Sequence, residues 1–257
     1  MSALVEVASS RNGTWRRIIL GGGAGNLLSL DLVRAIGQAI HAVEADRGTK
    51  WLTIEGGGGD FSYGARIQEH TAELMATVLP ETHRVLKQLL AFPAPTAALV
   101  GGHCLGGGFE LALACDDILA TEHATFGFPE IRLAAFPPAG AAILPLRVGA
   151  SRATRAIVTG QIQDARYWHD SGLLSMVGTQ SSLLDAASSW FDTHLAPHSA
   201  TALAHAALAS RLTLRAQAEP ALESAERDYL GGLLKTHDAI EGVAAWLEKR
   251  SPNWKDE

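Results

Sequence analysis

Hydrophobic residues in the first half of the chain alternate between the short continuous runs of buried strands and the three-to-four-residue spacing of helices. Four runs have the length of strands: residues 4–7, 15–20, 50–55 and 96–100. One apolar face at helical spacing, made by Leu30, Val33, Ile36, Ile40 and Val43, predicts a helix between the second and third runs. A longer helical segment, at about residues 69–90, precedes the fourth run. Strand and helix therefore alternate, which predicts βαβ units in an α/β fold.

Strand patterns fade after Phe136, and helical patterns replace them. Residues 139–148, 152–159 and 164–171 have helical spacing, and residues 182–247 are rich in alanine and leucine. We therefore expect an α/β core that carries the active site over residues 1–190, followed by a helical C-terminal region over residues 191–257.

Composition indicates a soluble globular protein. The 257 residues are 47% hydrophobic and 19% charged, and the net charge of −6 argues against binding to nucleic acid. Two cysteines, Cys104 and Cys115, provide no disulfide framework, so we expect both to be buried and reduced.

Neither a signal peptide nor a membrane span is predicted. Residues 1–10 include Glu6 and lack a basic segment followed by an apolar one. The most apolar stretch, residues 134–146, is interrupted by Pro137, Pro138 and Gly140, and it is shorter than the roughly 18–20 residues of a span. We expect a cytoplasmic protein without membrane contact.

A glycine-rich turn and two glutamates form the most informative motif. The strand-like residues 96–100 lead into glycines within residues 101–108, and an Ala/Leu-rich helix follows. A helix start of this kind presents free backbone N–H groups. Glu110 lies one turn inside the helix, and Glu130 follows twenty positions later. Donors beside two carboxylates suit proton transfer next to a developing oxyanion.

Other chemistries fit less well. None of the glycine clusters completes the G-x-G-x-x-G spacing of a dinucleotide site or a phosphate-binding loop. His194 and His198 are four residues apart, but Pro197 interrupts the helix and no glutamate lies between them, so no zinc site is predicted. We expect neither a metal nor another cofactor.

Three motifs together resemble the crotonase (enoyl-CoA hydratase/isomerase) superfamily. They are Phe61-Ser62-x-Gly64-Ala65, Gly106-Gly107-Gly108-x-Glu110-Leu111-Ala112 and Pro129-Glu130-Ile131. Residues 26–28, 152–153, 159–160, 241–242 and 247–250 fit the same pattern, so the resemblance covers nearly the whole chain in order. It implies a spiral of ββα units, with a helical C-terminal oligomerisation region that assembles a homotrimer or hexamer.

The resemblance also implies roles for particular residues. The backbone N–H groups of Ala65 and Gly107 would form an oxyanion hole for a thioester carbonyl. Glu110 and Glu130 would do the acid–base work of a hydratase, and CoA would enter as part of the substrate. Further contacts with substrate or CoA are expected from Ser62, Tyr63, Gly64, Arg66, Ile67, Gly106, Phe136 and Pro137. Arg66 either faces solvent or contacts a CoA phosphate, and His103 reads as a structural histidine rather than a base.

Substrate choice stays open at this stage. Phe136, Pro137 and Pro138 stand where common enoyl-CoA hydratases have a glycine-rich loop, and this variant is similar to cyclohexa-1,5-diene-1-carbonyl-CoA hydratases of benzoyl-CoA degradation. The stiff, bulky segment suits a flat carbocyclic acyl group, or it is ordinary loop variation in a linear-chain hydratase. An enoyl-CoA isomerase and a catalytically inert acyl-CoA-binding protein are the alternatives.

Overall fold

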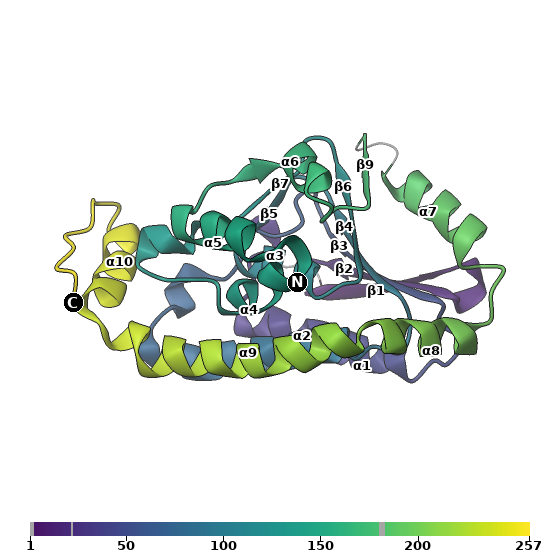
Figure 1. Ribbon diagram of the computed structural model, residues 1–257, viewed down its shortest axis with the longest axis horizontal. Helices are drawn as coiled ribbons and strands as arrows, with labels where there is room; N and C mark the ends of the chain where they lie inside the picture. The colour runs from purple at the N-terminus through teal and green to yellow at the C-terminus, as the bar shows by residue number, and fades with distance from the viewer. Residues whose placement is uncertain (1–2, 22, 180–182) are drawn as a thin grey trace.

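The computed structural model describes residues 3–21, 23–179 and 183–257, and it is a mixed α/β molecule (Figure 1). Its larger sheet has the strand order β1-β2-β3-β4-β6-β9. These strands are β1 (Val5–Ser10), β2 (Trp15–Leu20), β3 (Trp51–Gly56), β4 (Thr96–Val100), β6 (Asp117–Thr121) and β9 (Met176–Gly178). β1 pairs antiparallel with β2, and every other neighbouring pair is parallel.

Side chains from alternate positions of this sheet enter two separate cores. Ile18, Ile54 and Ile118 belong to the main core, which also includes residues of helix α1 (Leu30–Glu44). On the other face, Trp15 and Trp51 lie 5.0 Å apart between ring centroids and pack against helix α7 (Leu183–His194). The sheet is thus buried on both faces, as parallel sheets require.

A small second sheet contains β5 (His103–Leu105), β7 (Thr125–Gly127) and β8 (Gln163–Asp164). The sequence patterns predicted one turn from the fourth strand to the next helix, but β5 interrupts that turn. β5 pairs parallel with β7, and the Gly106 N–H donates to the Gly127 carbonyl over 2.9 Å. This pairing brings the start of helix α3 (Gly107–Leu113) beside the segment that follows β7.

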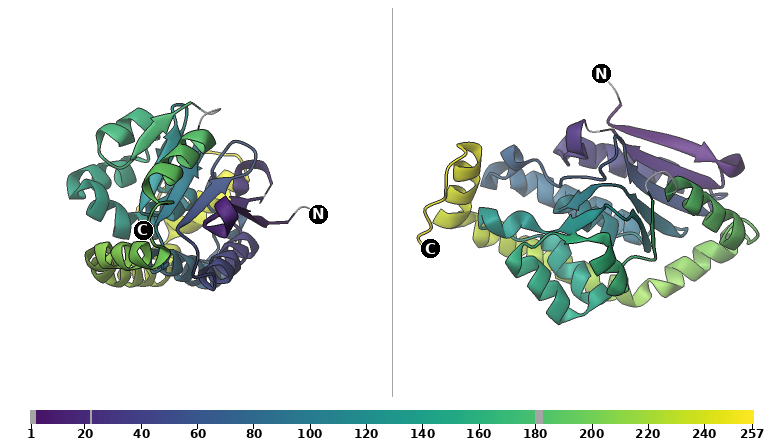
Figure 2. Two further views of the ribbon diagram at one scale, coloured as in Figure 1. Left: turned by 90° about the vertical axis from the view of Figure 1, so that its right-hand side faces the viewer. Right: turned by 90° about the horizontal axis from the view of Figure 1, so that it is seen from above.

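The other helices cover and extend the sheets (Figures 1 and 2). They are α2 (Ala72–Leu90), α4 (Pro138–Val148), α5 (Ala150–Thr159), α6 (Ala165–Asp170), α8 (Ala200–Ser210), α9 (Leu212–Gly231) and α10 (His237–Leu247). α9 runs along one side of the molecule in contact with α2 and α4. The predicted helices from residue 139 onward are present, whereas the short strands β8 and β9 were not expected. The division of the chain after residue 190 stays a prediction.

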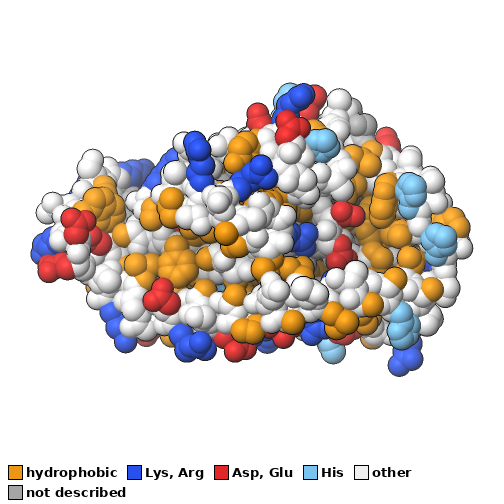
Figure 3. All heavy atoms as spheres, in the orientation of Figure 1, with side chains coloured by type: hydrophobic (Ala, Val, Ile, Leu, Met, Phe, Trp, Pro, Cys, Tyr) orange, Lys and Arg blue, Asp and Glu red, His pale blue; other side chains and the backbone are white. Residues whose placement is uncertain are grey.

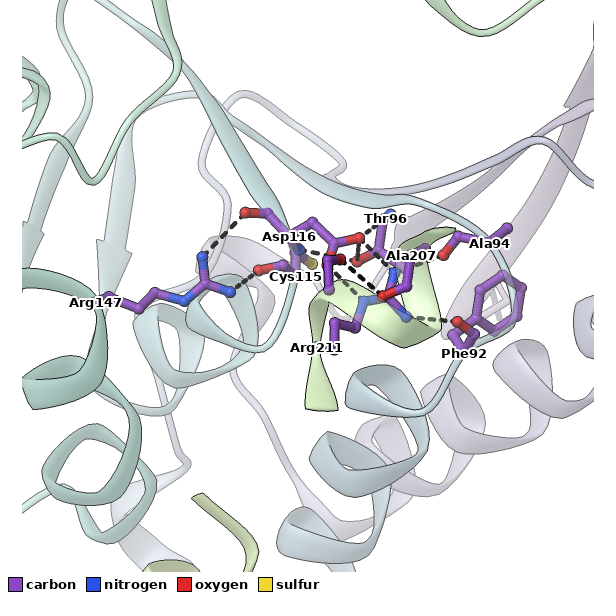
Figure 4. Close-up of polar contacts among 9 residues, drawn as sticks. Phe92, Ala94, Thr96, Cys115, Asp116, Arg147, Ala207 and Arg211 are labelled. Carbon is purple, nitrogen blue, oxygen red and sulfur yellow. Dashed lines mark hydrogen bonds and ion pairs between the residues drawn. The ribbon is translucent and has the colours of Figure 1, made fainter. Parts of the chain in front are cut away.

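A buried polar network fixes the start of α9 to the sheet (Figure 4). Arg211, which is 3% exposed, donates to the carbonyls of Phe92 and Ala94 over 2.5 and 2.6 Å. Its guanidinium also binds the carboxylate of Asp116, which accepts from both the N–H and the hydroxyl of Thr96. One arginine therefore links α9 to the start of β4 and to the turn after α3.

Two simpler expectations can be compared directly with the structure. Cys104 and Cys115 are both buried and free, as predicted. Within the described residues, no helix is long and apolar enough to cross a membrane.

Candidate active site

Buried polar side chains fix the position of the turn at residues 62–65. The amide of Asn26, a residue that is 1% exposed, donates to the carbonyls of Gly57, Asp60 and Phe61. The hydroxyl of Ser62 donates to the Asn26 carbonyl and accepts from the Gly64 N–H. These bonds fix the direction of the peptide groups that follow.

Gly64 is required by this geometry. Its φ is +91°, and a Cβ atom there would lie 2.7 Å from the carbonyl oxygen of Leu105. The Gly64 carbonyl accepts from Leu28 N–H, and the Leu28 carbonyl accepts from Arg66 N–H. The N–H of Ala65, between these two bonds, has no acceptor among the described residues.

The N–H of Gly107 is the second unpaired donor. It belongs to the first residue of α3, where no helical acceptor exists, and no other described residue accepts from it. A Cβ atom on Gly107 would lie 3.6 Å from the Ala65 amide nitrogen and 3.8 Å from Glu110 Oε2. Two free N–H groups and one carboxylate therefore border the same small space.

Glu110 projects from the first turn of α3 and is 5% exposed. Its Oε1 accepts from the Gly140 N–H over 2.8 Å, at the start of α4. Burial raises the pKa of Glu110 to about 7, although hydrogen bonds from Gly140 and Ala139 oppose the rise. One oxygen is thus anchored while Oε2 is left for chemistry.

Glu130 lies in a short 3₁₀ helix, η4 (Pro129–Leu133). Burial, followed by the charge of Glu110, raises its pKa to about 8. Its Oε2 atom is buried and has no hydrogen-bond partner among the described residues. Near neutral pH the two glutamates therefore share protons, which suits one acid and one base.

Both glutamates, Ala65 and Gly107 line one enclosed pocket, which we call the acyl pocket. α2 contributes one wall with Met75, Val78, Leu79 and Thr82. The other lining residues are Leu28, His70, Phe136, Pro138 and Tyr229. Apart from its few polar groups the pocket is apolar, as expected for a site that binds a hydrocarbon chain or ring.

A second hollow adjoins the first at Ala65, His70 and Glu130, and we call it the entrance groove. Its lining also includes Tyr63, Gly64, Ile67, Gly106, Pro129, Arg132, Leu133 and Trp246. The shared residue Ala65 places its free N–H group at the junction of the acyl pocket and the entrance groove, and Gly107 lines the acyl pocket beside it. This arrangement fits a long ligand with its reacting carbonyl at the junction.

The structure brings most of the predicted site residues together. Tyr63, Gly64, Ile67 and Gly106 line the entrance groove, and Phe136 lines the acyl pocket. Ser62, Arg66 and Pro137 line neither hollow. Ser62 is fully buried beneath the turn, Arg66 is exposed, and Pro137 precedes α4 while its neighbour Pro138 reaches the pocket.

His103 has the structural contacts that the sequence suggested. Its Nδ1 lies 2.8 Å from Thr125 Oγ1, and its ring contacts Tyr63 with 4.8 Å between centroids.

Other pocket residues were missed by reading the sequence. Four α2 residues recur at helical spacing: Met75, Val78, Leu79 and Thr82. The sequence therefore indicates that they share one face of a helix, but it does not indicate that this face borders a pocket. Tyr229 lies 99 positions beyond Glu130 in an Ala/Leu-rich helical stretch with no motif around it. Only the tertiary fold places it beside the glutamates.

Comparison with known proteins identifies the family. Residues 21–257 match the family model described as enoyl-CoA hydratase/isomerase. This chain belongs to the enoyl-CoA hydratase/isomerase family. The predicted superfamily and α/β fold class are thereby confirmed, and acyl-CoA is the class of ligand that the family description supports.

Individual relatives of this enoyl-CoA hydratase/isomerase family member cover it almost completely. The cyclohexa-1,5-dienecarbonyl-CoA hydratase of Thauera aromatica is 34% identical over 99% of this chain and 98% of its own length. The 2,3-dehydroadipyl-CoA hydratase of Escherichia coli (strain K12) is also 34% identical, over 90% of this chain and 91% of its own. Among solved structures, an enoyl-CoA hydratase from Mycobacterium avium subsp. paratuberculosis K-10 has a TM-score of 0.86 at 28% identity, covering 99% of both chains.

Proposed function

We propose that this family member is a hydro-lyase that adds water to a double bond conjugated to a CoA thioester, and that its substrate is cyclohexa-1,5-diene-1-carbonyl-CoA. The observation that carries the hydratase function is the meeting of two buried carboxylates with two unpaired N–H groups in one pocket. The named relatives support the same activity. In benzoyl-CoA degradation such an enzyme would hydrate the ring.

The N–H groups of Ala65 and Gly107 would receive the thioester carbonyl oxygen. When water adds to the conjugated double bond, negative charge moves to that oxygen, and two fixed donors stabilise it more strongly than they stabilise the neutral carbonyl. One such donor is typically worth about 3–4 kcal/mol of transition-state stabilisation. CoA would then extend along the entrance groove.

Glu110 and Glu130 would supply the base and the acid. An ionised glutamate takes a proton from water as its oxygen attacks the β-carbon, and the protonated glutamate delivers a proton to carbon. Because burial and mutual repulsion raise both pKa values, the pair can hold a single proton near neutral pH. Hydration needs no electron transfer, so these groups and the oxyanion hole suffice without a resident cofactor or metal.

The ring substrate is favoured by the wall of the acyl pocket. Phe136 meets Tyr229 edge to face, with 5.3 Å between centroids, and Pro138 adds a rigid neighbour. The buried ring of Tyr229 and the partly buried ring of Phe136 form a stiff wall, which complements a planar carbocycle better than a flexible chain. The Thauera aromatica relative, matched over almost the full chain, supports the same choice.

The test is turnover of the purified protein on cyclohexa-1,5-diene-1-carbonyl-CoA and crotonyl-CoA in parallel, with products identified by mass. We expect the diene to be hydrated with the higher kcat/KM. Preference for crotonyl-CoA would make the protein a linear-chain hydratase, whereas turnover of neither would contradict the hydratase function. An isomerase would return products with the mass of the substrate.

We further propose a homotrimer or hexamer located in the cytoplasm. Hydrophobic side chains reach the surface at the α10 end of the molecule and near α7 (Figure 3). Val158, Leu212 and Ile240 are each more than half exposed. Apolar surface of this kind supports burial against further subunits.

A further inference from the structure

Tyr229 is the residue of α9 that reaches the acyl pocket. It is 1% exposed and lines the pocket together with Glu110 and Glu130. Its ring is fixed by the edge-to-face contact with Phe136. Within the described part of the chain, no residue forms a hydrogen bond with its hydroxyl group.

Glu130 Oε2 is a second polar atom of this pocket without a partner. Leaving a buried polar atom unpaired costs free energy, so proteins rarely keep one without a ligand or water to satisfy it. Negative charge on Glu130 and then on Glu110 raises the pKa of Tyr229 beyond the rise caused by burial, so its hydroxyl lies within electrostatic reach of both carboxylates. The enclosed volume of about 40 Å³ is large enough for a water molecule.

We infer that Tyr229 is a further catalytic residue, whose hydroxyl donates a hydrogen bond to the oxygen atom that is water before the addition and the product's hydroxyl group after it. Glu130 Oε2 accepts a hydrogen bond from the same oxygen. This inference rests on the hydratase function proposed above, but it is independent of which acyl group is bound.

The proposed contacts account for every valence of the reacting oxygen. Water has two protons and two lone pairs. Glu130 accepts from one O–H, Glu110 accepts from the other, Tyr229 donates to one lone pair, and the remaining lone pair forms the bond to the β-carbon. One water proton passes to the ionised glutamate, and the other glutamate gives its proton to carbon. Tyr229 keeps its own proton throughout and acts by orienting the oxygen.

The helix that carries Tyr229 is anchored close to the pocket. Glu226, one turn earlier on α9, has its Oε2 2.7 Å from Nδ1 of His83 on α2. His83 is 2% exposed, so this contact is sheltered from solvent. α2 also provides one wall of the acyl pocket, so the tyrosine and that wall are held to each other. A rigid support of this kind is what an orienting group needs.

The test is Tyr229→Phe, which keeps the ring and removes only the hydroxyl. We expect kcat to fall about tenfold, KM to change less than about twofold, and the thermal unfolding temperature to stay the same. The limb of the pH profile that reports ionisation of the glutamate pair should move to higher pH, because the water that donates to Glu130 loses the hydroxyl donor that polarises it. His70 is the other titratable group that lines the acyl pocket. It is the same in the wild type and in Tyr229→Phe, so it does not account for a difference between their pH profiles.

Tyr167→Phe is the matched control. Its ring also meets a neighbour edge to face, Trp168 at 5.1 Å, but it lines neither hollow, so kcat and the pH profile should stay as in the wild type. The double variant that combines Tyr229→Phe with Glu130→Gln should lose little more activity than Glu130→Gln alone, since the Tyr229 hydroxyl and the Glu130 carboxylate bind the same oxygen atom.

Three results would overturn the inference. The first is a Tyr229→Phe protein with kcat within twofold of the wild type and unshifted pH limbs. The second is a double variant whose losses simply multiply. The third is a wild type that hydrates no enoyl-CoA, which would refute the proposed function as well, whereas the first two refute the role of Tyr229 alone.

Discussion

Gly106 and Glu130 lie so close together that the glycine cannot carry a side chain without moving the carboxylate. A Cβ atom on Gly106 would be 2.5 Å from Glu130 Oε1, and the residue has a φ of +51°. At the residue scale, this part of the site could be predicted from the sequence, because the glycine-rich motif and both glutamates form local patterns. Tyr229 and His70 could not be found in the same way, since nothing adjacent to them in the chain marks them.

Gly106→Ala should therefore abolish most activity. The methyl group displaces Glu130 from the acyl pocket, so we expect kcat/KM for hydration to fall about 100-fold or more in a steady-state assay. Gly172→Ala is the matched control. Gly172 also has a positive φ, +79°, but a Cβ atom there would meet nothing within 4 Å. It should lose some stability and keep its activity; equal losses of activity would show that backbone strain alone is responsible.

The activity should have a bell-shaped dependence on pH. Below about pH 7 both Glu110 and Glu130 are protonated and no base is available, whereas above about pH 8 both are ionised and no acid is available. We therefore expect kcat/KM to be highest between these pH values. The two limbs of the profile should report the coupled titration of Glu110 and Glu130. A profile flat from pH 5 to 9 would contradict the assignment.

At the scale of elements, the sequence patterns located the long helices and strands β1 to β4, but they did not predict β6 and they missed four short strands, β5, β7, β8 and β9. These four short strands have two or three residues each, too few for an alternating pattern to be recognised. Their register is set by pairing with distant segments, and β5 with β7 brings Gly106 toward Glu130. The buried network at the start of α9 was also invisible, because Arg211 and Asp116 are 95 positions apart.

Arg211→Ala should destabilise the fold strongly. The substitution leaves the Asp116 carboxylate and the carbonyls of Phe92 and Ala94 without their donor in a buried setting. We expect the free energy of unfolding in urea to fall by about 3–5 kcal/mol. Arg11→Ala, which removes the exposed ion pair with Asp192, should change it little. Equal effects of the two substitutions would mean that the buried network contributes no more than a surface pair.

At the scale of the whole molecule, the active site is assembled from four separate regions. The turn at residues 62–65, the start of α3, the η4 segment and α9 meet around one pocket, with α2 as a wall. Resemblance to a family could assign the first three regions, because each carries a motif. The acyl pocket depends on how α2 and α9 pack. Packing between helices that are distant in the sequence cannot be predicted from a local sequence pattern.

Incorporation of ¹⁸O from labelled water tests the central claim, hydration by the glutamate pair. We predict that the wild type gives a product that has gained one molecule of labelled water. Glu110→Gln and Glu130→Gln should each slow this gain about 100-fold or more, while Glu219→Gln, at a partly exposed ion pair on α9, should leave it unchanged. A product with the mass of the substrate, or gain of labelled water by the Glu110→Gln protein at the wild-type rate, would contradict the account.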